Sequence, residues 1–306
     1  MSSATHAVSK SEIARLGATP STQAMRNPAI IEQDTGVSQL LRQSDVVLVL
    51  GVGAFEFGEL VEGLDIVCAV IGLHPFVDSR VGDMRQYRYE VGAELGVAAL
   101  LCQSLIAQAK LPIQVREFFD SLDLGHIAAE SALAEEELAE IVCSVQQAKS
   151  PMIIVGESFR RHTFAPLIHK LLAMIGTYCA IDMLCASDVG LRMLAYDKNV
   201  DSRAFAPILH ALEELPESNG ALVYLSLLDE RDLAQPVLCA TPAFLRLAHL
   251  QDKEQVRLLV DSTQVECVAQ QVSYLQGATA VLKGWRGAKI YPFIKARFAR
   301  NGGYNG

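Results

Sequence analysis

Short runs of apolar residues alternate with longer amphipathic segments along most of the chain. Residues 45–50 (DVVLVL) form a run of β-branched and other apolar residues that ends at Gly51, which is typical of a strand buried on both faces of a parallel sheet. Residues 57–64 then show helical spacing, and residues 65–71 form a second apolar run. A strand, a helix and a second strand in this order predict a β-α-β unit.

The same order recurs in the second half of the chain. Residues 150–156 (SPMIIVG) predict a buried strand that meets a glycine turn, followed by a helix over 164–175 and a strand over 178–184. Residues 90–109 are apolar at helical spacing and too long for a strand, so they predict a well-buried helix. Further on, the pattern predicts helices over 202–215 and 242–250 and strands over 220–226 and 256–260.

Strands that alternate with helices predict an α/β protein with two Rossmann-like lobes, mostly parallel sheets and an extended basic C-terminal segment. The start of the chain is polar and lacks sustained periodicity, which is typical of a loose arm. The last thirty residues are rich in glycine and break the pattern, so they predict the extended segment. The predicted parts are an arm at 1–35, a first lobe at 36–133, a second lobe at 134–219, a return to the first lobe at 220–265 and the C-terminal segment at 266–306.

Composition narrows the class of protein. The chain has 306 residues, of which 51% are hydrophobic and 20% charged, which is enough to bury a substantial core in two domains. It shows no apolar run long enough for a membrane span and no secretory signal near Met1, so we expect a cytoplasmic protein without direct membrane insertion. The seven cysteines lack the short spacings of zinc or iron–sulfur ligands, so we expect no such cofactor.

Charge is distributed unevenly along the chain. The net charge of −9 disfavours nucleic-acid binding, which needs a surplus of lysine and arginine on one face. After Glu266 the sequence has no acidic residue, and basic residues lie among aromatic ones. Arginine and aromatic side chains are favoured in protein interfaces, so the segment is predicted to dock on a partner. The predicted docking residues are Lys283, Trp285, Arg286, Lys289, Tyr291, Lys295, Arg297 and Arg300.

A second interpretation of this segment stays open, because its aromatic side chains could pack on the chain's own second lobe. The two interpretations differ in what a deletion of residues 283–306 does. If the segment only docks on a partner, the shortened chain still folds. If the segment belongs to the protein's own core, the shortened chain unfolds.

Two strand-to-helix turns carry candidate ligand-binding groups. Gly51 and Gly53 begin a dinucleotide fingerprint, but its third glycine position is Glu56, whose carboxylate would repel a pyrophosphate. A plain turn with weak or no NAD(H) binding is therefore the favoured interpretation. After the strand near residue 155, three potentially cationic groups could bind a small anion, although a solvated loop is the simpler interpretation. These groups are Arg160, Arg161 and His162.

The sequence contains none of the common motifs of an enzyme active site. The histidines lack the spacing of metal ligands, and there is neither a nucleophile elbow nor a phosphate-binding P-loop. The acidic run at residues 135–137 is explained by a helix start, because carboxylates complement the positive end of the helix dipole. We therefore expect no catalytic residues within this chain.

Five segments between residue 44 and about residue 200 share one resemblance. They are 44–51 (SDVVLVLG), 89–101 (YEVGAELGVAALL), 122–131 (LDLGHIAAES), 135–137 (EEE) and 151–156 (PMIIVG). In this order, over about half of the chain, they resemble the molybdopterin oxidoreductase-like region found in the large peripheral-arm component of NADH-quinone oxidoreductase, which is respiratory complex I. That family usually has a long cysteine-rich N-terminal part that binds iron–sulfur clusters, which this sequence does not contain.

The resemblance implies a non-catalytic scaffold subunit of a complex I-like assembly, with no cofactor of its own and with other subunits of the assembly as partners. It implies a cytoplasmic position, peripheral to the inner membrane through those partners. Two alternatives stay open. Residues 146–156 are also similar to the start of the central domain of thiamine diphosphate enzymes, which implies an enzyme fragment that binds a nucleotide or thiamine-type cofactor. The other alternative is a free-standing module that binds a small anion.

Overall fold

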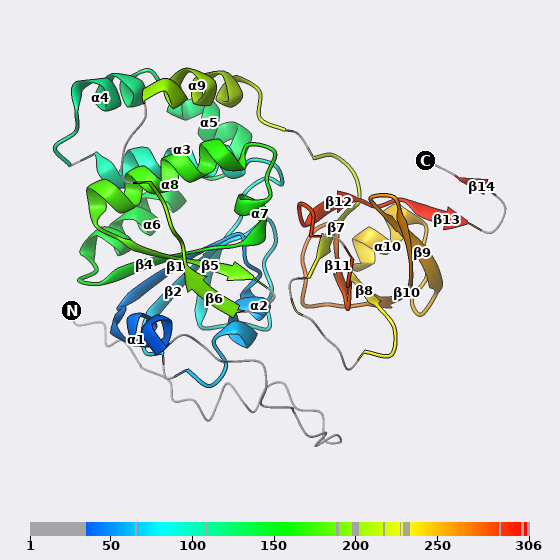
Figure 1. Ribbon diagram of the computed structural model, residues 1–306. Helices are drawn as coiled ribbons and strands as arrows, with labels where there is room; N and C mark the ends of the chain where they lie inside the picture. Colours follow the sequence, from blue (N-terminus) through cyan, green and yellow to red (C-terminus); the bar gives the residue numbers. More distant parts are fainter. Residues whose placement is uncertain are drawn as a thin grey trace. The chain divides into compact units, whose positions relative to one another are not determined.

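The computed structural model describes residues 35–304, except 65, 108, 188–189, 198–201, 217, 227, 229–232, 288 and 301–302. The described part contains two sheets, each with its own hydrophobic core (Figure 1). The predicted arm at residues 1–35 lies outside the described residues, apart from its last position.

The first sheet is built from strands in the first two thirds of the chain. Its strand order is β3-β2-β1-β4-β5-β6. Neighbouring strands from β3 to β5 pair in parallel, and only the edge strand β6 is antiparallel to its neighbour. These strands are β1 (Val46–Leu50), β2 (Ala69–Leu73), β3 (Met84–Tyr87), β4 (Pro151–Val155), β5 (Asp182–Ser187) and β6 (Gly190–Met193).

Helices cover both faces of the first sheet (Figure 1). Leu48 and Leu50 of β1 belong to a core that includes side chains of α3 (Glu94–Ile106), α6 (Glu135–Gln147) and α8 (Ala165–Cys179). Val47 and Val49 face the opposite way, toward α1 (Thr35–Gln43) and α2 (Ala54–Leu60). Burial on both faces explains why these strands are continuous apolar runs in the sequence. The remaining helical elements of this lobe are α4 (Ile113–Asp120), α5 (Leu124–Ser131), α7 (Glu157–Arg160), η2 (Ser202–Ala204) and α9 (Phe205–Glu213).

The second sheet is built from the rest of the chain. Its strand order is β12-β7-β11-β8-β10-β9-β13-β14, in which β7 with β11 and β8 with β10 are parallel and the other pairs are antiparallel. Phe244 and Leu245 of α10 (Pro242–Ala248) lie in its core. The strands are β7 (Leu222–Leu225), β8 (Val237–Ala240), β9 (Gln255–Val260), β10 (Thr263–Gln271), β11 (Thr279–Lys283), β12 (Phe293–Lys295), β13 (Phe298–Arg300) and β14 (Gly303–Tyr304).

A separate hydrophobic cluster joins the two lobes. Phe76 and Val91 come from the first lobe, and Tyr224, Leu275 and Phe293 come from the second. A loop of the first lobe also pairs with the second, because the Ser79 amide donates to the Tyr274 carbonyl at 2.9 Å next to an isolated bridge between Asp78 and Leu275. The second lobe is therefore anchored on the loops that follow the strands of the first sheet.

The predicted α/β class, with Rossmann-like strand order and mostly parallel strands in the first sheet, is confirmed. The division of strands between lobes differs from the prediction. β1 and β4, assigned to separate lobes at 36–133 and 134–219, pair along their whole length from Val46↔Pro151 to Leu50↔Val155. The repeated β-α-β order fits one continuous sheet as well as two separate ones, and the local pattern does not distinguish them.

The C-terminal third also differs from the prediction. Residues 220–265 do not return to the first sheet but contribute β7 to β9 and the start of β10 to the second. Residues 266–306 are not a separate extended segment, because β11 pairs with both β7 and β8 inside the second sheet and β12 pairs with β7. Glycines between these short strands break the periodicity in the sequence, although the strands themselves are regular.

Candidate functional site

The strand order of the first sheet indicates where a ligand would bind. The order 3-2-1-4-5-6 is that of doubly wound nucleotide-binding sheets, in which ligands lie at the carboxyl ends of the strands, where the strand order reverses. Here that point lies between β1 and β4. The turns that would form the crevice follow Leu50 and Val155, at Gly51 and Gly156.

The two turns at this point touch each other. The Gly156 amide donates to the Leu50 carbonyl at 2.7 Å, and a Cβ atom on Gly156 would overlap the Gly51 carbonyl. Gly51 has φ +66°, and a Cβ atom on it would overlap the Ser158 hydroxyl. Gly156 is therefore required by a close backbone approach and Gly51 by its left-handed backbone conformation, and the space between the turns is already filled.

Glu56 binds the chain's own second lobe. The Tyr224 hydroxyl donates to Oε2 of Glu56 at 2.6 Å, and the Ser226 hydroxyl donates to Oε1 at 2.8 Å. The Gly53 amide also donates to Oε2, at 3.2 Å. Burial raises the pKa of Tyr224 well above its usual value, so the phenol stays neutral and remains a donor. Glu56, at the third glycine position of the dinucleotide fingerprint, thus forms a contact between the two lobes.

His74 follows β2 and lies in an aromatic enclosure. Its ring centroid lies 4.6 Å from that of Phe76, 4.9 Å from that of Tyr224 and 5.6 Å from that of Phe293. Burial lowers the pKa of His74 to about 4, so its imidazole is neutral at neutral pH. Only 4% of His74 is exposed, so this base is enclosed away from bulk solvent.

Arg80 connects the lobes at the rim of this region. Its guanidinium forms an ion pair with Asp78 and lies 4.0 Å from the ring centroid of Phe55 and 3.7 Å from that of Tyr274. Phe55 belongs to α2, and Tyr274 precedes β11 of the second sheet. A guanidinium stacked between two aromatic faces is held by cation–π attraction, so Arg80 stabilises the contact between the lobes.

A small pocket remains among these side chains. Its cavity volume is about 30 Å³, and its lining includes Glu56, His74, Arg80, Tyr224, Tyr274 and Lys283. Sites for cofactors and drug-sized ligands usually have several hundred Å³, whereas this volume suits one or two water molecules. The pocket is therefore too small for a nucleotide or a pterin.

A second buried carboxyl group, Glu94, lies at the start of α3. The Tyr291 hydroxyl, from the C-terminal segment, donates to its Oε1 atom at 2.7 Å, and the Gly92 amide donates to the same hydroxyl oxygen at 3.1 Å. The Glu94 side chain is fully buried, and burial raises its pKa to about 7. Tyr291 and Tyr224 thus each donate to a buried carboxyl group of the first lobe.

The three predicted anion-binding groups are engaged within the chain. Arg160 and Arg161 both form ion pairs with Glu157, and Arg161 also donates to the Lys289 carbonyl. His162 is buried, with Nε2 at 2.9 Å from the Gly92 carbonyl oxygen. These groups therefore do not converge on an open anion site.

The predicted docking residues fall into groups with different environments. Tyr291 is directed into the first lobe, and Trp285 packs half-buried against the core of the second. Lys283 lines the small pocket. Arg286, Lys289, Lys295 and Arg297 are at least partly exposed, and the Arg300 side chain lies outside the described residues.

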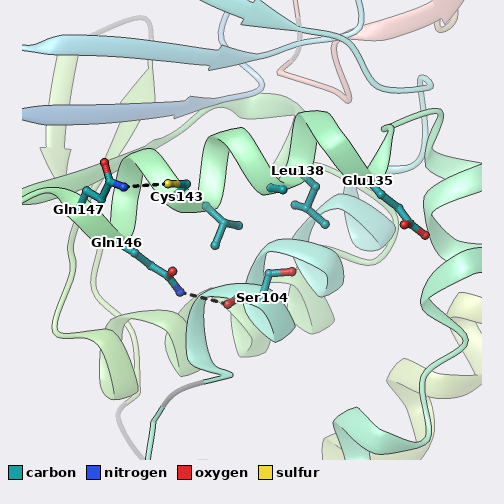
Figure 2. A pocket seen from close by; sticks show the side chains of 8 residues that line it. Ser104, Glu135, Leu138, Cys143, Gln146 and Gln147 are labelled. Carbon is teal, nitrogen blue, oxygen red and sulfur yellow. Dashed lines mark hydrogen bonds between the residues drawn. The ribbon is translucent and has the colours of Figure 1, made fainter. Parts of the chain in front are cut away.

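A larger surface groove lies between α3 and α6 (Figure 2). Its volume is about 430 Å³, and it is lined by Ser104 of α3 and by the exposed side of α6. Gln146 reaches across it to donate to the Ser104 carbonyl at 3.4 Å. Glu135 is the one acidic group in the lining, at the end of the groove away from Gln147, and no basic group accompanies it. The groove thus lacks a catalytic pair.

Neither a metal-binding cluster nor a membrane-spanning helix is found in the described part of the chain. No group of three or more histidine, cysteine, aspartate or glutamate side chains there could hold a metal ion. Among the same residues, none of the helices is both long and apolar enough to cross a membrane. In comparisons with known proteins, no family model and no curated sequence matches this chain.

Proposed function

We propose that this protein is a non-catalytic scaffold subunit of a complex I-like respiratory NADH-quinone oxidoreductase. The observation that carries the proposal is the filled carboxyl edge of the first sheet. Tyr224 and Tyr291 of the second lobe lie where a nucleotide would bind in a sheet of this strand order. The edge that holds a ligand in such sheets here holds the two lobes together.

The buried acids and bases at this edge support the same role. Glu56, His74 and Glu94 are 4%, 4% and 0% exposed. A general acid or base has to come within hydrogen-bond distance of its substrate, directly or through one water molecule. Acidic and basic groups enclosed between two lobes of one chain are suited to a structural contact and poorly suited to catalysis, because a substrate does not reach them.

The class of assembly is proposed from the resemblance found between residue 44 and about residue 200. The similar segments lie in the first lobe, where they supply β1, α3, α5, the start of α6 and β4. They are scaffold elements of the sheet and its covering helices. Partner subunits of the assembly would hold the chain at the cytoplasmic side of the inner membrane.

The exposed end of the second lobe is the proposed contact with those partners. Lys295 ends β12, and Arg297 precedes β13. Both lie at the surface, in a stretch without acidic residues. Charge of one sign on the rim of an interface favours association with an oppositely charged partner. Salt screens this attraction and so weakens the association.

Reversing these two charges tests the proposal. The tagged full chain, purified gently from its own cells, should bring with it iron–sulfur subunits that oxidise NADH. The double variant Lys295→Glu/Arg297→Glu should lower the recovered NADH-oxidising activity roughly tenfold, since two rim charges contribute about 1–2 kcal/mol to association. Lys110→Glu/Arg116→Glu, which changes the same charge at exposed positions of the first lobe, should recover the wild-type amount. Recovery of the wild-type chain alone, or with partners that contain no iron–sulfur cluster, would refute the proposal.

A further inference from the structure

Glu94 lies where three parts of the chain meet. It begins α3, and Tyr291 from the C-terminal segment and His162 from the turn after α7 lie against it. Its Oε1 atom accepts a hydrogen bond from Tyr291 at 2.7 Å and a longer one from Tyr89 at 3.4 Å. Its Oε2 atom has no hydrogen-bond partner among the described residues. Oε2 of this fully buried carboxyl group therefore accepts no hydrogen bond from the described residues.

His162 does not supply a positive charge that would stabilise an ionised Glu94 carboxylate. Its Nε2 atom lies 3.5 Å from Oε2 of Glu94 but only 2.9 Å from the Gly92 carbonyl oxygen, to which it donates. Its Nδ1 atom accepts from the Phe164 amide at 3.1 Å, which leaves no place for a second ring proton. Burial also lowers the pKa of His162. The imidazole is thus held neutral by its hydrogen bonds.

The other ionisable groups around Glu94 place no cation in contact with its carboxyl group. Burial raises the pKa of Tyr89 and of Tyr291, so both phenols stay neutral. On α7 and the turn after it, the guanidinium groups of Arg160 and Arg161 both pair with Glu157 instead of Glu94. An ionised carboxylate in this position would be buried without a cation in contact, which is costly in a protein interior.

We propose that Glu94 takes up a proton when a short segment before β12, residues 289–292, docks on the first lobe, so that the docking of Tyr291 is linked to protonation. With Tyr291 in place, water is excluded and the neutral carboxyl group is favoured. When the segment lifts away, water reaches Glu94 and the ionised form is favoured. The contact is therefore tight in weakly acidic solution and looser in alkaline solution.

The pH range follows from the raised pKa. Burial raises the pKa of Glu94 from 4.5 to about 7, so its favourable contribution is complete below the unfolded value and is lost as the pH rises through about 7. Between pH 6 and pH 8.5 this linkage changes the docking equilibrium by roughly tenfold.

Hydrogen exchange of the full chain tests the linkage. The protection factors of amides in residues 289–295, which correct for the intrinsic pH dependence of exchange, should fall by roughly tenfold from pH 6 to pH 8.5. Glu94→Gln mimics the protonated group and should abolish this fall. Glu117→Gln removes an exposed carboxylate of α4 and should retain it.

A second variant keeps the test decisive if Glu94→Gln folds poorly. The Tyr291 hydrogen bond lowers the pKa of Glu94, so Tyr291→Phe should move the midpoint of the pH transition upward. Protection that is independent of pH in the wild type, or a fall that persists in Glu94→Gln, would overturn the proposal. So would an unchanged midpoint in Tyr291→Phe.

Discussion

Removing residues 283–306 should unfold the second lobe rather than release a folded chain from a partner. The deletion takes away the end of β11 and all of β12 to β14, so β7 loses its neighbour on the outer side. It also removes Phe293, which is 6% exposed and lies in the cluster between the lobes. Truncating one buried phenylalanine to alanine costs about 3–5 kcal/mol, which is comparable to the whole stability of many domains.

Circular dichroism and thermal unfolding of the purified proteins measure this effect. The shortened chain should lose the strand signal of the second lobe and its cooperative transition. The double variant Lys295→Glu/Arg297→Glu, with the same segment present, should unfold within about 0.5 kcal/mol of the wild type, because both side chains lie at the surface. A shortened chain with unchanged strand content and melting temperature would show that the segment is only a docking element.

Gly156→Ala should lower the free energy of unfolding by about 3 kcal/mol, because overpacking at a site without room forces the backbone to move. The new methyl group would overlap the carbonyl oxygen and carbon of Gly51, and backbone atoms cannot give way as the end of a flexible side chain does. The disturbed contact holds β1 and β4 together at the carboxyl edge of the first sheet. The expected cost is therefore larger than that of an average substitution.

Gly58→Ala is the matched control. Gly58 lies in α2 with no atom near the position of a new Cβ, and alanine has the higher helix propensity. Urea unfolding should show Gly58→Ala equal to or slightly more stable than the wild type. Equal stability of Gly156→Ala and the wild type would mean that the two turns are not in contact.

Much of the first lobe could be predicted from the sequence because its strands are buried on both faces. β1 and β4 are unbroken apolar runs beside glycine turns, and α3 is apolar along most of its length. The strand predicted over 65–71 begins later in the structure, at Ala69–Leu73. Residues 66–68 lie before the strand, and apolar composition alone does not show where pairing begins.

The end of the second lobe was harder to predict because its last strands, β12 to β14, have only two or three residues each. β12 has three residues, and its neighbours in the sequence include glycines, lysines and a proline. Its partner β7 lies about seventy residues earlier, so the pairing depends on contacts that local periodicity does not contain. Aromatic residues mixed with basic ones predicted an interface, and for Tyr291 and Phe293 the interface is internal.

The candidate site was only partly visible in the sequence. Glu56 stood out because it occupies a glycine position of a known fingerprint, and in the structure its carboxyl group accepts hydrogen bonds from the second lobe. Glu94 carried a weaker signal, as a carboxylate inside an otherwise apolar helix. Nothing local connects either residue to Tyr224 or Tyr291, because those contacts span more than 160 residues.

The filled carboxyl edge of the first sheet is tested most directly by calorimetric titration of the intact chain with NADH. Glu56, Tyr224 and the touching turns at Gly51 and Gly156 leave no space for a pyrophosphate. We expect no binding heat at NADH concentrations up to about 1 mM, which corresponds to a binding free energy weaker than about −4 kcal/mol. Saturable binding of one NADH per chain with a micromolar Kd would contradict this account.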